Sequence, residues 1–145
     1  MAYSIIDDTS TPSDTFDNFF TGDTSAVIKN LRSGTPATII PAMASRFGIS
    51  QESLFDHLRL PRNTLKDQIR KNAVLSSTEQ DRLYRADRVW KRTLEVLEDE
   101  NSARRWIIRT NRSLGGEAPL ALLDTEVGYE LVLDTLGRIE HGVVA

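Results

Sequence analysis

Apolar residues recur along most of the chain at three- and four-residue steps, the spacing of one face of an α-helix. Polar or helix-breaking residues separate these periodic stretches. The pattern predicts helices at about residues 24–33, 36–47, 51–58, 62–71, 77–97, 102–110 and 126–140, and a short helix that starts at Pro119. No stretch shows the period-two alternation of a half-buried strand, so the expected fold class is all-α.

The side chains expected to face inward are aliphatic and aromatic, with a few small residues between them. In the first half of the chain they are Ile39, Ile40, Met43, Ala44, Phe47, Leu54, Phe55, Leu58, Leu65 and Ile69. In the longest helix they are Leu83, Ala86, Val89, Trp90, Thr93, Leu94 and Leu97. Beyond it they are Trp106, Ile107, Val127, Leu131, Val132 and Leu136.

Hydroxyl side chains mark the starts of two predicted helices. Ser76 with Glu79, and Ser77 with Gln80, each offer a capping box for the longest helix. Thr125 is placed to cap the last helix. These capping residues support the helix boundaries that the apolar period predicts.

The first 22 residues have a different composition from the rest. Residues 1–22 are rich in Ser, Thr and Asp and contain Pro12, which is typical of a weakly ordered arm. Phe16, Phe19 and Phe20 are spaced to share one face of a short helix. They either pack on the main core as a satellite cluster, which we favour, or form a contact in a dimer.

Charge is arranged in blocks, although the net charge of the whole chain is only −3. Residues 1–26 carry −5 and residues 27–72 carry +5. Residues 73–112 carry +2 and residues 113–145 carry −5. A basic centre between acidic ends allows an anionic polymer to bind at the centre alone. Helical proteins also segregate charge without such a role, so the blocks do not by themselves identify a partner.

Several function classes lack support. No apolar run approaches the roughly 18 residues of a membrane span, and residues 1–8 lack the basic and apolar regions of a secretory signal. The 145 residues include no cysteine, and a cytoplasmic protein is expected. His57 and His141 belong to no spaced ligand cluster, and Gly115-Gly116 lacks the pattern of a phosphate loop. We therefore expect no metal, no cofactor and no enzymatic activity.

Residues 51–71 have the spacing of a helix-turn-helix, with a tight turn at about 59–61. In that motif the second helix enters the major groove of DNA, and its polar residues contact base edges and phosphates. Leu65 and Ile69 point the other way, toward the core. The candidate DNA-binding residues are Arg62, Asn63, Thr64, Lys66, Gln68, Arg70 and Lys71.

Two other interpretations of this region remain open. A competing frame begins at Ala44 and takes the 51–58 helix as the one that reads DNA. That helix carries Glu52 and Asp56, which phosphates would repel, so we prefer the 51–71 frame. The second interpretation is a solvated basic helix with no role in DNA binding.

Two stretches of the chain carry motifs in a characteristic order. The first consists of Leu60-Pro61-Arg62-Asn63-Thr64-Leu65, then Leu75-Ser76, Glu79 and Asp81-Arg82-Leu83-Tyr84-Arg85-Ala86. The second consists of Ala103-Arg104-Arg105-Trp106-Ile107, then Asn111-Arg112-Ser113-Leu114-Gly115-Gly116-Glu117-Ala118-Pro119-Leu120, Leu122-Leu123-Asp124-Thr125-Glu126, Gly128, Val132 and Leu136-Gly137-Arg138-Ile139-Glu140-His141-Gly142-Val143. Together they resemble the Xre/ParS/MbcA family of type II antitoxins over about residues 50–145.

The resemblance implies an Xre/Cro-like helix-turn-helix domain followed by a small helical toxin-binding domain. We place these domains at residues 23–98 and 99–145, after the arm at 1–22. The resemblance also implies a cognate RES-type toxin that consumes NAD, whose active-site entrance the C-terminal domain covers, and repression of the shared promoter. We expect a homodimer to present its reading helices to an inverted repeat about 34 Å apart, and we expect no membrane association.

The toxin contact is expected within residues 103–145. The candidate toxin-binding residues are Asn111, Leu114, Gly115, Gly116, Thr125, Arg138, His141, Gly142, Val143 and Val144. The alternative for apolar members such as Leu114, and for Trp106, is core packing. A rival interpretation is a helix-turn-helix regulator with a ligand-sensing pocket in residues 103–145. Another is an adaptor that binds no DNA.

Overall fold

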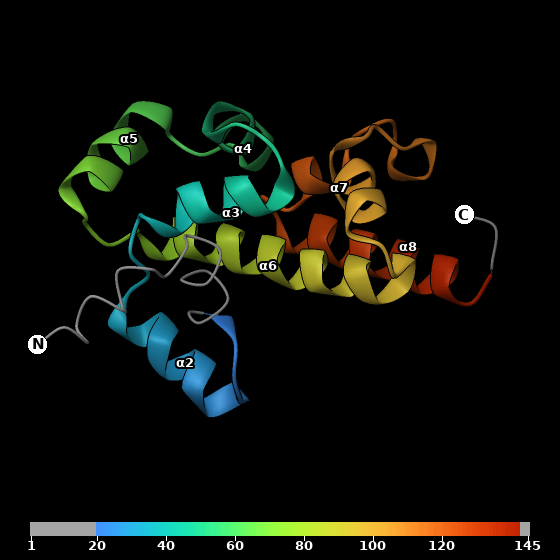
Figure 1. The fold of residues 1–145 in the computed structure, drawn as a ribbon, viewed down its shortest axis with the longest axis horizontal. Coiled ribbons are helices and arrows are strands. Elements are labelled where there is room, and N and C mark those ends of the chain that lie inside the picture. The colour runs from blue at the N-terminus through green and yellow to red at the C-terminus, as the bar shows by residue number, and fades with distance from the viewer. Residues whose placement is uncertain (1–19, 143–145) are drawn as a thin grey trace, which may run out of the picture. The chain divides into compact units, whose positions relative to one another are not determined.

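The computed structural model describes residues 20–142, and within them nearly all regular structure is helical (Figure 1). The elements are α2 (Thr24–Ser33), α3 (Ile39–Phe47), α4 (Gln51–Leu58), α5 (Arg62–Lys71), α6 (Ser77–Leu97), α7 (Glu100–Ile108), the 3-10 helices η2 (Arg112–Leu114) and η3 (Pro119–Leu122), and α8 (Glu126–Glu140). The all-α prediction is confirmed. Phe16 and Phe19 lie outside the described residues, whereas Phe20 is buried.

The described chain divides into two compact units. The N-terminal unit comprises residues 20–54 and 61–80, and the C-terminal unit comprises residues 55–60 and 81–142. Helices α4 and α6 therefore each supply residues to both units. The domains expected from the sequence, at residues 23–98 and 99–145, are instead two continuous stretches of the chain. These boundaries remain a prediction.

The core of the N-terminal unit follows the predicted apolar positions. Ser50 caps α4 by accepting from the Ser53 amide at 3.0 Å, and Asp23 caps α2 by accepting from the Ala26 amide at 2.8 Å. Ile69 is only half-buried. The fully or nearly fully buried residues of the predicted set in this unit are Ile39, Ile40, Met43, Ala44, Phe47, Leu54 and Leu65.

The second predicted helix starts later than expected, at Ile39 instead of 36. The preceding backbone pairs with another loop: the Ala37 amide donates to the Ala73 carbonyl at 2.8 Å, and the Leu75 amide donates to the Thr35 carbonyl at 2.9 Å. This pairing holds the segment extended. Sequence periodicity alone does not reveal it, because the partner lies far along the chain.

One of the two capping boxes predicted for α6 forms. The Ser76 amide donates to Glu79 Oε1 at 3.0 Å, and the Glu79 amide donates to Ser76 Oγ at 3.2 Å. The alternative box does not form, because Gln80 Oε1 instead accepts a hydrogen bond from the buried Thr35 hydroxyl.

In the C-terminal unit, α8 lies beside α6 and runs in the same direction (Figure 1). Near the start of α8, Arg85 of α6 reaches the Leu123 carbonyl, and near its end Arg92 pairs with Glu140. The 3-10 helix η3 packs against both α7 and α8. The buried residues of this unit that the sequence predicted are Phe55, Leu58, Leu83, Ala86, Val89, Trp90, Thr93, Ile107, Val132 and Leu136.

Helix α7 begins at Glu100, two residues before the predicted start. Its N-cap is Asp99, whose Oδ2 accepts from the Ser102 amide at 2.8 Å. Hydrogen bonds from Ser102 lower the pKa of Asp99, so the cap is ionised at neutral pH. Trp106 was expected to be buried on this helix, but it is half-buried.

Two residues of α8 were wrongly predicted to face inward. Val127 is 77% exposed and Leu131 is 40% exposed. The buried face of α8 instead contains Gly128, Val132 and Thr135. Because successive helical residues are about 100° apart, a face centred on those positions turns Val127 toward solvent.

Gly128 allows α8 to approach η3 very closely. A Cβ atom at this position would lie 2.0 Å from the Leu122 carbonyl oxygen, far inside van der Waals contact. The Gly128 amide also donates to Thr125 Oγ1 at 3.0 Å, which caps the helix as predicted. The start of α8 therefore depends on the absence of a side chain here.

Two arginines of α6, three residues apart, hold the ends of two other segments. Arg82 Nη1 donates to the carbonyls of Leu58 at 3.2 Å and Arg59 at 2.7 Å, where α4 ends. Arg85 Nε donates to the Leu123 carbonyl at 2.8 Å and its Nη2 to the Asp124 carbonyl at 3.2 Å. Charged donors thus satisfy carbonyls that have no partner within their own helices.

Replacing Gly128→Ala should lower the free energy of unfolding by about 2–3 kcal/mol, because the methyl group must displace backbone. Gly137→Ala in the same helix is the matched control, since a Cβ there meets nothing within 4 Å. The control should be neutral or stabilising by up to about 1 kcal/mol. Chemical denaturation of both variants measures the difference, and equal effects would show that the close approach is not constraining.

Replacing Arg85→Met should lower the free energy of unfolding by about 1–3 kcal/mol, because two carbonyls lose their donors. Arg104→Met is the control, since Arg104 pairs with Glu100 four residues away at the surface. Its loss should cost less than about 0.5 kcal/mol. A cost for Arg85→Met no larger than that of the control would refute the role given to this arginine.

Candidate functional site

Helix α5 presents most of the predicted DNA-binding residues to solvent. Leu65 is fully buried and anchors the helix. Gln68 departs from the expected outward face: it is half-buried, and its Oε1 is buried without a hydrogen-bond partner in the described part of the chain. The exposed members of the predicted set are Arg62, Asn63, Thr64, Lys66, Arg70 and Lys71.

The turn before α5 is tight. The Leu60 amide donates to the Phe55 carbonyl at 2.9 Å, and Arg59 adopts the left-handed conformation with φ of 53°. Arg59 also pairs with Asp124, with 3.4 Å between Nε and Oδ2. Pro61 then occupies the N-cap position of α5 with extended backbone. Two short helices joined in this way have the spacing of a helix-turn-helix, and the choice of this frame over the one that begins at Ala44 stays a prediction.

Glu52 of α4 binds two of the candidate DNA-binding cations. Its Oε2 lies 3.0 Å from Arg62 Nε, and its Oε1 lies 2.8 Å from Lys66 Nζ. From the sequence, this carboxylate was expected only to repel phosphates in the competing frame. The pairing could not be read from spacing, because it joins residues ten and fourteen positions apart across a turn.

Asp67 plays the same part at the other end of α5, where it pairs with Arg70 and Lys71. The Lys71 ammonium, 3.0 Å away, lowers the pKa of Asp67 below its ordinary value. The carboxylate is therefore ionised at neutral pH. Four cations share two carboxylates, which leaves this surface with an excess of two positive charges.

Four of the predicted toxin-binding residues build one closed loop. The Asn111 amide donates to the Glu117 carbonyl at 3.1 Å, and the Gly116 amide donates back to the Asn111 carbonyl at 3.0 Å. Gly115 and Gly116 have φ of 70° and 81°, which favours glycine at both positions. Leu114 is 3% exposed, so it can support the loop but presents little surface to a partner.

The remaining predicted toxin-binding residues lie at the two ends of α8. Thr125 caps its start, whereas Arg138, His141 and Gly142 are exposed at its end. The two ends are roughly 20 Å apart along a helix of this length, so the structure does not bring all these residues to one point. Arg138 pairs with Asp134 at 2.8 Å. Val143 and Val144 lie outside the described residues.

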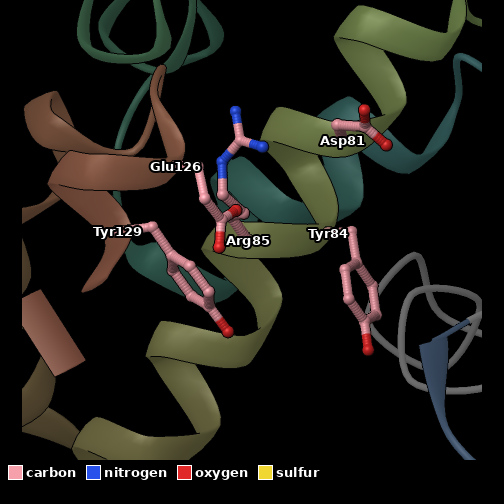
Figure 2. A pocket seen from close by; sticks show the side chains of 5 residues that line it. All are labelled: Asp81, Tyr84, Arg85, Glu126 and Tyr129. Atoms are coloured by element: carbon pink, nitrogen blue, oxygen red, sulfur yellow. The ribbon is translucent and has the colours of Figure 1, made fainter.

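The C-terminal unit contains a pocket of about 350 Å³ that was not predicted from the sequence. Figure 2 shows Asp81, Tyr84 and Arg85 of α6 together with Glu126 and Tyr129 of α8 around it. In Figure 2 the Tyr129 ring and the Glu126 carboxylate reach from α8 toward α6. Tyr84-Arg85 is part of a sequence motif noted above, but the sequence spacing gives no sign that these residues lie near Tyr129.

Arg88 fixes the two tyrosines of this pocket. Its Nη1 lies 3.5 Å from the Tyr84 hydroxyl, and it also hydrogen-bonds the Tyr129 hydroxyl. Partial burial acts to lower the pKa of Arg88, but the two tyrosines outweigh it and raise that pKa above its ordinary value. Burial is also the main cause that raises the pKa of Tyr129, so this phenol is neutral at physiological pH.

In residues 20–142 no cluster of three or more His, Cys, Asp or Glu side chains is arranged to hold a metal ion. Within the same range, no helix combines the length and hydropathy that a membrane span requires.

Both parts of the chain match described antitoxin domains. Residues 26–86 match the Antitoxin Xre-like helix-turn-helix domain, and residues 93–142 match the Antitoxin Xre/MbcA/ParS C-terminal toxin-binding domain.

Full-length relatives agree with these domain matches. A protein named Antitoxin Xre from Photorhabdus laumondii is 31% identical over 121 residues, covering 79% of this chain and 78% of that protein. Another Antitoxin Xre, from Yersinia enterocolitica, is 25% identical over 81% of this chain and 80% of its own length. A third, from Pseudomonas putida, is 29% identical over 57% of this chain and 52% of its own length. The chain therefore belongs to the Xre/MbcA/ParS family of antitoxins, with a helix-turn-helix domain ahead of a C-terminal toxin-binding domain.

Proposed function

We propose that this antitoxin neutralises a cognate RES-type, NAD-consuming toxin and represses its own operon. In this proposal a homodimer binds an inverted repeat in the promoter through α5, and the C-terminal unit covers the entrance to the toxin's active site. The chain acts in the cytoplasm, where its operator lies, and it performs no catalysis itself.

The exposed polar face of α5 supports the DNA-binding part. Arg62, Asn63 and Thr64 occupy its first turn, which is the end that leads into the major groove in this motif. Arginine and asparagine are suited to guanine and adenine edges, and the lysines are suited to phosphates. Because the excess charge is only two, one helix binds weakly, and a dimer is needed for useful affinity.

The charge and surface of the C-terminal elements support the toxin-binding part. Residues 113–145 carry a net charge of −5, opposite in sign to the α5 surface. The 111–117 loop and the end of α8 are exposed, and Gly142 follows the last helix with φ of 71°. An acidic surface suits an enzyme pocket that binds a phosphate-bearing substrate, because the carboxylates can mimic that charge.

The main support for the proposal is that the α5 surface and the predicted toxin-binding residues belong to different compact units. The cations of α5 belong to the N-terminal unit, and the predicted toxin-binding residues belong to the C-terminal unit. One chain can therefore hold DNA and toxin on separate surfaces. A ligand-sensing regulator is the second candidate function, because the C-terminal unit contains the pocket described above.

Co-expression with the product of the neighbouring gene tests both activities. Wild-type chain should rescue growth from that product, co-purify with it and repress a promoter reporter. Arg62→Ala/Lys66→Ala should lose repression and keep rescue, and Lys29→Ala/Arg32→Ala on α2 is the charge-matched control. A chain that represses the reporter but neither rescues growth nor co-purifies a partner would instead be a plain regulator.

Glu52→Gln should strengthen binding to operator DNA by roughly 3- to 10-fold, because two surface ion pairs of about 0.2–1 kcal/mol each no longer need to break. The slope of log affinity against log salt should become steeper by up to about 0.9 for each additional phosphate contact. Glu117→Gln makes the same charge change in the C-terminal unit and should alter neither quantity. Unchanged or weaker binding by Glu52→Gln would mean that α5 does not use Arg62 and Lys66 on phosphates.

A further inference from the structure

The pocket between α6 and α8 has two charged groups that the fold does not use. Asp81 and Glu126 line it, are exposed, and form no ion pair or hydrogen bond through their side chains within the described residues. Three other acids of the C-terminal unit are paired: Asp124 with Arg59, Asp134 with Arg138, and Glu140 with Arg92. The pocket therefore offers two carboxylates that remain available to a ligand.

The two arginines of this region already have partners. Arg85 donates to the Leu123 and Asp124 carbonyls at 2.8 and 3.2 Å, and Arg88 donates to the tyrosine hydroxyls. An anionic ligand would have to compete for these donors. A cationic ligand in the pocket would contact the two carboxylates and the rings of Tyr84 and Tyr129. The faces of aromatic rings attract guanidinium and ammonium groups.

Hydrogen bonds and one close backbone contact hold the walls of the pocket. Arg88 holds both rings by their hydroxyls, Arg85 ties α6 to the backbone just before α8, and Gly128 keeps α8 close to η3. A volume of about 350 Å³ lies at the lower end for small-ligand pockets and suits one long side chain. Fixed walls reduce the ordering cost of binding.

The surroundings point to a polypeptide as the source of that side chain. Val127 is 77% exposed and Leu131 is 40% exposed, one helical turn apart on α8, beside Glu126 in the sequence. An exposed apolar strip next to a pocket for one charged anchor has the composition of a protein–protein contact.

We propose that this pocket receives one arginine or lysine side chain of the partner toxin, with Val127 and Leu131 packing on the toxin surface around it. The proposal rests on the toxin-binding function proposed above and names the chemistry of the contact. Asp81 and Glu126 bind the cation, and Arg88 is a positioning residue that holds the rings.

The test uses the full chain with Asp81→Asn/Glu126→Gln, which removes both charges and keeps the side-chain shapes. Glu95→Gln/Glu98→Gln is the matched control, since it removes two exposed carboxylates of the same unit that lie outside the 111–117 loop and α8 and form no side-chain ion pair or hydrogen bond within residues 20–142. The pocket variant should bind the neighbouring gene product at least about tenfold more weakly than wild type. The control should lose less than about threefold, and both should melt within a few degrees of wild type.

A chemical probe separates the pocket from the toxin. N-acetyl-arginine methylamide, titrated into isotope-labelled wild-type chain, should shift amide resonances around Tyr84, Glu126 and Tyr129, and the uncharged norleucine analogue should not. Toxin binding that is equal for wild type and the pocket variant, with no such shifts, would overturn this inference and leave the proposed function standing. Failure of wild-type chain to bind the toxin would instead overturn the proposed function, and this inference with it.

Discussion

Two guanidinium groups on α6 organise the C-terminal unit. Arg82 holds the carbonyls at the end of α4, and Arg85 holds the carbonyls just before α8. Each arginine carries a permanent positive charge and donates to two backbone carbonyls at the end of a segment. Carbonyls at a helix end lack hydrogen-bond donors from the same helix. The Arg59–Asp124 ion pair joins the same two segments directly. The spacing of two arginines along one helix thus sets where the other segments can begin and end.

This junction also determines which surfaces the unit exposes. With its start fixed by Arg85 and Thr125, α8 can press against η3 only because Gly128 has no side chain. That contact selects the buried face of α8 and turns Val127 outward. The same arrangement places Glu126 and Tyr129 opposite Tyr84, which creates the pocket. The apolar strip and the acidic pocket therefore follow from one packing constraint.

The two units differ in how their charged side chains are paired. On the α5 surface, Glu52 and Asp67 each bind two cations, so the helix is partly neutralised and its side chains are held in place. Such a surface favours weak, salt-sensitive binding to an anionic polymer. In the C-terminal unit several carboxylates, such as Asp81 and Glu126, form no ion pair with any residue between 20 and 142.

Much of the helical architecture could be predicted from periodicity and capping. The bounds of α2, α4, α5, α6 and α8 match the prediction, because apolar spacing and residues such as Ser50, Ser76 and Thr125 act locally. The orientation of α8 could not be predicted in full, since Val127 and Val132 are equally apolar and packing against other segments of the unit decides which one is buried. The Glu52 pairs and the tyrosine pocket join residues distant in sequence, which composition and spacing do not reveal.

The central claim is that the toxin binds the C-terminal unit and leaves α5 free for DNA. Hydrogen–deuterium exchange of the chain alone and in complex with the neighbouring gene product tests it most directly, because it reports protection segment by segment. The account predicts slower exchange in the 111–117 loop and in α8 on complex formation, with exchange in α5 unchanged. Slower exchange in α5 with no change in α8 or the loop would contradict the account.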